Sequence, residues 1–424
     1  MKSVEEAYIA VLREELVPAQ GCTEPIALAY CAAVARETLG RMPERLRVQA
    51  SGNIIKNVKG VIVPGTGGRK GIEAAAVFGA VAGSAKRKLE VLSGISEEGG
   101  RAAAEFLARP GSCTVEHLAT DAKLHIIVEA YAGGDRALAE IRDRHTNLIR
   151  VERNAEVRYC GGEEESGHQE PQTDRSFMSV DGIISFAETV EFSKIDEVIS
   201  RQIAYNWKIS QEGLANPYGA CIGRTLLEHS KADAWTQAKA AAAAGSDARM
   251  SGSVLPVVIN SGSGNQGITV TLPVVVYARH IGADRERLVR AVAISNLVAI
   301  HQKTKVGRLS AYCGAVNAAA GSGAAIAWLD GASREVIALT ISNTLANVSG
   351  IICDGAKPSC AAKIASSVEA ALIGYELAKK ERSFQPGDGI VKADLEQTIS
   401  AVGELASKGM LQTDEEIIQI MISK

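Results

Sequence analysis

The sequence predicts an α+β protein that is mostly helical and contains a smaller α/β domain. Two observations support this class. Runs rich in β-branched residues alternate with helical segments between about Arg45 and Tyr159, whereas the chain beyond Asp181 consists mainly of amphipathic or alanine-rich stretches. The 424 residues are enough for two or three domains with well-filled cores.

The chain is predicted to begin with two helices. A capping-box pattern starts the first helix at Ser3, and Pro18 follows its end. A compact turn at 19–25 leads into a second apolar helix that runs through Thr38. The two helices are therefore separated by a short, glycine-containing connection.

The α/β segment follows these helices. Its predicted strands lie at 47–50, 58–63, 89–92, 113–118, 124–130 and 148–157. Its predicted helices lie at 71–86, 98–108 and 135–142. A polar, glycine-containing run at 160–176 is interpreted as an exposed connector.

The remainder of the chain is predicted to be helical. The expected helices lie near 195–209, 232–244, 285–300, 317–329, 333–347, 364–380 and 394–408. A last helix is capped by Thr413 and Glu416. Small residues in these helices favour close helix contacts around a central site.

Composition excludes several classes of protein. The net charge of −3 gives no electrostatic reason to expect nucleic acid or an anionic membrane as a partner. The N-terminal residues have no apolar core of a signal peptide, and the apolar run at 268–278 is too short to span a bilayer. We therefore expect a cytoplasmic protein that acts on a small molecule and that could form a homo-oligomer.

The eight cysteines are candidates for metal ligands or small buried hydrophobic residues. The cytosol keeps thiols reduced, so a disulfide framework is not expected. The sequence contains no Cys-x-x-Cys pair, so a metal site must be assembled from distant segments.

Three cysteines between residues 301 and 363 are expected at turns: Cys313, Cys353 and Cys360. Cys313-Gly314 and Cys353-Asp354-Gly355 each place a thiol close to a glycine, and Cys22 lies between Gly21 and the start of a helix. Glycine allows the backbone to approach a bound group closely. A helix N-terminus favours the thiolate of Cys22, which suits a metal ligand, although a buried cysteine in a packed turn is an equal alternative.

The segment 260–267 contains a Gly-x-Gly-x-x-Gly match but has no βαβ surroundings, which argues against dinucleotide binding. We interpret it as a loop whose amides, with Ser261, Ser263 and Asn265, bind a small carboxylate or pack under the metal site.

Six motifs in order carry a resemblance to a known family. They lie at 21–25, 51–57, 63–67, 260–267, 305–314 and 353–363. Together they resemble the L-cysteine desulfidase family, which is related to the α-chain-like domain of iron–sulfur L-serine dehydratases. The resemblance implies conversion of L-cysteine to pyruvate, ammonia and hydrogen sulfide without pyridoxal phosphate (PLP). It also implies a [4Fe–4S] cluster held by Cys22, Cys313 and Cys353, with Cys360 as an alternative third ligand.

The resemblance and the expected chemistry define further candidates. An open cluster iron can take the substrate sulfur, while a base removes the Cα proton and another group holds the carboxylate. The catalytic candidates are His301, Lys305, Tyr312 and Lys357, with Lys303 as a further choice. The substrate-binding candidates are Asn53, Lys56, Ser261, Ser263, Asn265 and Gln266.

The same resemblance suggests how the domains are arranged. Residues 1–44 should join residues 181–424 in a helical catalytic domain, because Cys22 must meet the other two ligands; residues 45–180 then form the inserted domain. In the serine dehydratases a C-terminal cysteine can occupy the fourth iron, whereas this sequence ends Ile422-Ser423-Lys424, so we expect an open iron. An L-serine dehydratase and a non-catalytic cluster-binding protein remain the alternatives.

Overall fold

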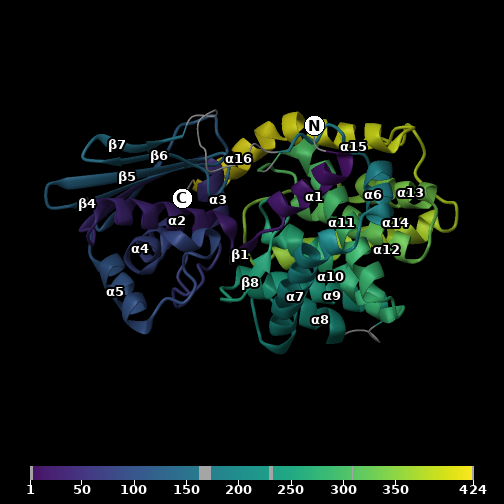
Figure 1. Cartoon of the computed structure of the whole chain (residues 1–424), viewed down its shortest axis with the longest axis horizontal. Helices are drawn as coiled ribbons and strands as arrows, with labels where there is room; N and C mark the ends of the chain where they lie inside the picture. The colour runs from purple at the N-terminus through teal and green to yellow at the C-terminus, as the bar shows by residue number, and fades with distance from the viewer. Residues whose placement is uncertain (1–2, 162–172, 229–232, 308, 423–424) are drawn as a thin grey trace.

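The computed structural model describes residues 3–161, 173–228, 233–307 and 309–422. It confirms the predicted α+β class. A six-stranded sheet with its helices occupies one end of the molecule, and the other helices form a bundle at the opposite end (Figure 1). Within the described residues, no helix combines the length and apolar composition that a membrane span requires.

The six-stranded sheet has the order β3-β2-β4-β5-β6-β7. Its strands are β2 (Arg45–Ala50), β3 (Cys113–His117), β4 (His125–Ala132), β5 (Asp135–Arg142), β6 (Leu148–Arg153) and β7 (Glu156–Cys160). Only the β2–β3 pair is parallel; the other neighbours are antiparallel. Strands β4 to β7 are joined by short turns, which suits antiparallel pairing.

Helices cover one face of this sheet. They are α2 (Thr23–Leu39) and α4 (Ile72–Ala82); α5 (Glu97–Ala108) packs on α4, and the short α3 (Gly52–Val58) follows β2 (Figure 1). Helices α2 and α4 pack closely, and a Cβ atom at Gly79 would lie 2.2 Å from the carbonyl oxygen of Ala29. The small residue therefore permits this helix crossing.

The helical bundle contains the remaining long helices. They are α1 (Val4–Glu15), α6 (Val180–Thr189), α7 (Ser193–Ala215), α8 (Ile222–Glu228), α9 (Ala234–Met250), α10 (Gly264–His280), α11 (Arg285–Val306), α12 (Gly314–Leu329), α13 (Arg334–Val348), α14 (Cys360–Ala378), α15 (Leu395–Glu404) and α16 (Leu411–Ile422). Helix α12 is central, because it packs against α10, α11, α13 and α14. Its alanines and glycines are buried, which lets four neighbours approach it.

Two connections join the sheet region to the bundle. Strand β1 (Pro18–Gln20) pairs antiparallel with β8 (Pro256–Val258), so the chain between α1 and α2 is fixed to the segment before α10. At the other end of the sequence, α16 leaves the bundle and packs on α3. Figure 1 shows this last helix reaching across to the sheet.

The N-terminal helices separate in space. Helix α1 packs against α6, α7 and α11 of the bundle, in agreement with its expected place in the helical part. Helix α2, which the prediction also assigned to that part, lies instead on β4, β5 and α4. Its first residue nevertheless reaches the bundle, because β1 and β8 hold the turn before it. The division into domains at 45 and 180 stays a prediction.

Several local predictions were wrong. The predicted helix 135–142 is strand β5, since a tight hairpin pairs it with β4 along its whole length. The predicted strand 58–63 is the end of α3 and a turn, and the predicted strand 89–92 is the end of a short 3-10 helix (Ala85–Glu90) and the turn after it. The predicted strand 148–157 is divided into β6 and β7 by a turn at Asn154 and Ala155, both with positive φ.

Four helices, α3, α6, α8 and α10, were not predicted. Helix α10 contains Pro273 in its interior. The expected connector at 160–176 lies partly outside the described residues, which exclude 162–172.

Candidate functional site

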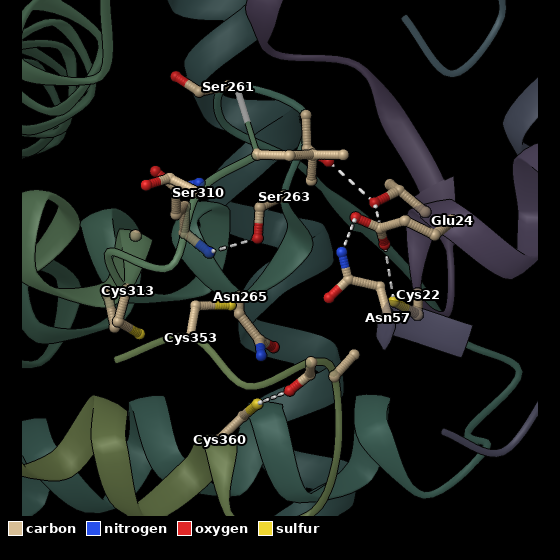
Figure 2. Close-up of a pocket in the computed structure, with 18 of the residues that line it drawn as sticks. Cys22, Glu24, Asn57, Ser261, Ser263, Asn265, Ser310, Cys313, Cys353 and Cys360 are labelled. Carbon is tan, nitrogen blue, oxygen red and sulfur yellow. Dashed lines mark hydrogen bonds between the residues drawn. The ribbon is translucent and has the colours of Figure 1, made fainter. Parts of the chain in front are cut away.

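A cavity of about 110 Å³ lies where the start of α2 meets the bundle. Four cysteine side chains line it: Cys22, Cys313, Cys353 and Cys360. Figure 2 shows the last three around one space, with Cys22 beside Glu24 at its edge. The four thiols come from segments up to 338 residues apart in sequence (360 − 22), so the fold assembles them.

Backbone pairing places Cys313 beside Cys353. The amide of Cys313 donates to the carbonyl of Ile351 at 3.0 Å, the amide of Cys353 donates to the carbonyl of Ala311, and Tyr312 forms a bridge with Ile352. Cys313 is the N-cap of α12. Burial, and secondly the neighbouring Cys353, raise the pKa of the Cys313 thiol. These two sulfurs are therefore held near each other by main-chain hydrogen bonds.

Cys360 is the first residue of α14 and also lines the cavity. Its thiol donates to the carbonyl of Gly355 at 3.7 Å, and burial raises its pKa. Gly355 has φ +91°, and a Cβ atom there would lie 2.4 Å from the carbonyl oxygen of Lys56. Only glycine fits this turn without displacement of the backbone. The turn thus holds Cys353 and Cys360 against α3.

Cys22 is the N-cap of α2 and is 2% exposed. Its thiol donates to Oε2 of Glu24 at 3.0 Å. Burial, and secondly the charge of Glu24, raise the pKa of the Cys22 thiol well above its usual value. Burial also acts to raise the pKa of Glu24, but the neighbouring His145 and the hydrogen bond from Cys22 outweigh it and lower that pKa to about 2.

A polar wall faces the cysteines. It consists of Ser261, Ser263, Asn265 and Gln266, at the start of α10, and Arg249, at the end of α9. The Nη1 atom of Arg249 donates to Oδ1 of Asn265 at 3.0 Å. Among the described residues, neither Nε of Arg249 nor Oε1 of Gln266 has a hydrogen-bond partner, although both atoms are buried. Such groups are costly unless a ligand satisfies them.

A family model described as the serine dehydratase alpha chain matches residues 86–419. The chain belongs to the serine dehydratase alpha chain family. A UPF0597 protein of Lachnoclostridium phytofermentans is 51% identical over 415 residues, covering 98% of this chain and 99% of that protein. A UPF0597 protein of Treponema denticola is 48% identical over 427 residues, covering 99% of each chain.

The fold of this chain brings many of the predicted site residues together around the cavity. The three predicted cluster ligands and Cys360 line the cavity, as do Ser261, Ser263, Asn265, Gln266 and Tyr312. Tyr312 is buried, its hydroxyl lies 3.4 Å from the hydroxyl of Ser349, and burial raises its pKa. Lys303, a further candidate, is also part of the lining. The roles of these residues stay predictions.

Other predicted residues lie outside the lining of the cavity. His301 is hydrogen-bonded to Glu396 at 2.6 Å, Lys305 is exposed on α11, and Lys357 donates to the carbonyl of Asp354 at 3.0 Å. His301 and Lys357 are therefore bonded to other groups of the protein, and Lys305 lies at the surface, so none of the three faces a ligand in the cavity.

Asn53 and Lys56 are also outside the lining, because both donate to the carboxylate of Asp414 on α16. Lys56 has a second partner, the carbonyl oxygen of Cys353 at 3.4 Å. Asn57, from the same helix, does reach the cavity. The polar residues of α3 thus have different neighbours: Asn57 lines the cavity, whereas Asn53 and Lys56 contact the C-terminal helix.

Three titratable residues of the lining escaped the prediction: Glu24, Arg249 and His145. Arg249 lies in the last turn of the alanine-rich helix α9, and an arginine at the end of a buried helix is a signal that could have been used. Glu24 was visible in the motif around Cys22. His145 lies in a turn between strands, and its spacing gives no indication of its position.

The donor set fits an iron–sulfur cluster. Thiolates are the usual ligands of such clusters, and four thiols face this cavity. Among the described residues, no group of three or more His, Cys, Asp or Glu side chains converges closely enough to hold a single metal ion. Cluster ligands bind different irons and need not converge on one point. A cluster is thus compatible with these separated cysteines.

Proposed function

We propose that this protein is a lyase that uses a [4Fe–4S] cluster to convert L-cysteine to pyruvate, ammonia and hydrogen sulfide. The observation that carries the proposal is the combination of four thiols and a buried, partly unsatisfied guanidinium in one cavity. The thiols suit a cluster, and the guanidinium suits the carboxylate of an amino acid. Family membership supports an elimination from a β-substituted amino acid.

Cys22, Cys313 and Cys353 would hold the cluster, with Cys360 as the alternative third ligand. When bound, a cluster with one open iron supplies a Lewis acid for the leaving group. Sulfur is a soft ligand that iron accepts readily, which favours L-cysteine as the substrate. PLP is not needed in this scheme.

Arg249 is positioned to bind the substrate carboxylate. It lines the cavity at 2% exposure, and its Nε atom lacks a hydrogen-bond partner among the described residues. Guanidinium groups bind carboxylates through two parallel hydrogen bonds, which also fixes orientation. The carbonyl oxygen of the Gln266 side chain offers an acceptor for the substrate ammonium group.

Burial of the site supports the chemistry. The cysteines and polar side chains are drawn from both the sheet region and the bundle, so they meet at the contact between these two parts. Exclusion of water strengthens the interactions of charged groups with the substrate.

The experiment is anaerobic purification, then iron and sulfide analysis and a pyruvate assay with L-cysteine and L-serine in parallel. We expect about four irons per chain and a higher kcat/KM for L-cysteine. A higher kcat/KM for L-serine would indicate the serine dehydratase alternative. A protein that holds the cluster but produces no pyruvate from either substrate would indicate a non-catalytic cluster-binding protein.

A further inference from the structure

His145 is a buried histidine that the chemistry above does not use. It lies between β5 and β6 of the sheet, is 6% exposed, and lines the cavity that the cysteines share. An imidazole from the sheet region therefore enters a site whose other walls belong largely to the bundle.

One ring nitrogen of His145 has no hydrogen-bond partner in the described part of the chain. Its Nε2 atom is buried and makes no hydrogen bond with any described residue. The nearest carboxylate oxygen, Oε1 of Glu24, is 3.8 Å away, which is beyond a hydrogen bond. A buried polar atom normally has a partner, so this nitrogen points to a group that the protein alone does not supply.

The oxygens of Glu24 already have partners, so this carboxylate is suited to position the imidazole of His145 and not to act as the base itself. Its Oε2 atom already accepts from Cys22 at 3.0 Å and from Thr23 at 3.2 Å. Its Oε1 atom faces Asn57 at 3.5 Å and His145. These contacts fix the carboxylate beside the imidazole, so Glu24 limits the positions that the ring of His145 can take.

We propose that His145 is the base that removes the Cα proton of the substrate, and that Glu24 is its positioning residue. This inference rests on the proposed function. Tyr312 is a weaker candidate, because its hydroxyl lies near Ser349 and burial raises its pKa. His301 faces Glu396 outside the cavity lining.

The proposed step is balanced in atoms and charge. The Cα proton moves to Nε2 of His145, the electrons of the C–H bond form the Cα=Cβ double bond, and the Cβ–S bond breaks to release hydrosulfide. The imidazolium returns its proton to hydrosulfide, which leaves as hydrogen sulfide. The 2-aminoacrylate product tautomerises to 2-iminopropionate, and water hydrolyses this imine to pyruvate and ammonia.

The test compares His145→Gln and His145→Asn with His117→Gln in the anaerobically reconstituted protein. His117 is an exposed histidine on β3 of the same sheet, so it is the matched control. Three quantities are measured for each protein: iron content, the Kd for L-alanine by calorimetry, and kcat with L-cysteine. L-alanine has a carboxylate and an ammonium group but no leaving group, so it reports binding alone.

We expect both His145 variants to keep their iron and to bind L-alanine within about threefold of the wild type, while kcat falls about 100-fold to 10,000-fold. Exchange of the L-alanine Cα proton with D₂O, followed by NMR, should disappear in the same variants. His117→Gln should match the wild type in every measurement.

Retention of more than a tenth of kcat in either His145 variant would overturn the assignment. Loss of iron or of L-alanine binding in both variants would also overturn it, because His145 would then have a structural role. If the wild-type protein holds a cluster but makes no pyruvate, the proposed function itself has failed, and the base assignment fails with it.

Discussion

The buried ion pair between Lys56 and Asp414 is expected to hold the C-terminal helix α16 on α3. Lys56 is 1% exposed and Asp414 is 4% exposed. The pair joins two segments 358 residues apart, and Asn53 donates to the same carboxylate at 3.1 Å. Replacement of Lys56 by methionine keeps the length of the side chain and removes its charge.

The cost of Lys56→Met follows from the burial of its partner. Removal of one member of a buried ion pair typically costs about 3 to 5 kcal/mol, because the other charge stays buried without compensation. Asn53 still donates to Asp414, so we expect the lower end, about 3 kcal/mol. This corresponds to about a 100-fold increase in the equilibrium constant for opening of α16.

Hydrogen exchange measured by mass spectrometry tests this expectation. Amides of α16 should exchange about 100-fold faster in Lys56→Met, whereas amides of the distant α7 should be unchanged. The matched control is Lys408→Met, which removes an exposed ion pair with Glu404 and should change exchange little. Exchange of α16 within about threefold of the wild type in Lys56→Met would refute the reasoning.

Three further predictions concern the cavity and its surroundings. Serine at Cys22, Cys313 or Cys353 removes a soft thiolate, so iron content and pyruvate formation should fall together in each variant. Arg249→Lys should raise the KM for L-cysteine about 10-fold to 100-fold, because lysine lacks the paired donors of a guanidinium. Burial raises the pKa of Asp247 to about 6, so its native state loses stability relative to the unfolded state as pH rises from about 4 to 6. Urea unfolding of Asp247→Asn should therefore show a gain in stability over the wild type at pH 7 that is absent at pH 3.5.

Each of these predictions has a control and a contradicting result. Serine at Cys31 or Cys113 should leave iron content nearly intact, and loss of the cluster in Cys360→Ser but not in Cys353→Ser would reassign the third ligand. An unchanged KM in Arg249→Lys would remove Arg249 from the substrate site. For Asp247→Asn, an equal stability difference at both pH values would contradict the burial argument.

Local sequence patterns predicted most of the long helices, because those helices repeat apolar residues at helical spacing along one continuous segment. They failed where pairing with a distant or neighbouring strand decides the structure. Residues 135–142 have good helix formers, yet hydrogen bonding to β4 makes them a strand. Helix α10 was also missed; it is buried among other helices and contains Pro273.

The candidate site shows the same division. Cysteines beside glycines could be recognised from the sequence, because a thiol at a turn is a local signal. The positions of Arg249 and His145 could not, since each reaches the cavity only through the packing of its own element. Lys56 was expected to face a substrate, but the C-terminal helix supplies Asp414 as its partner, and no local pattern reveals a contact over that separation.

The arrangement of the four cysteines depends on a few linked backbone contacts, and a single variant can test whether these contacts affect binding of the cluster. The β1–β8 pair fixes the turn before Cys22, and the bridge between Tyr312 and Ile352 fixes Cys313 beside Cys353. Gly355 then allows the Cys353 turn to press against the backbone of α3. Since α3 is held in turn by α16, displacement of the C-terminal helix would loosen the turn that carries one candidate ligand. The Lys56→Met variant should therefore lose iron faster than Lys408→Met when both are incubated with a chelator.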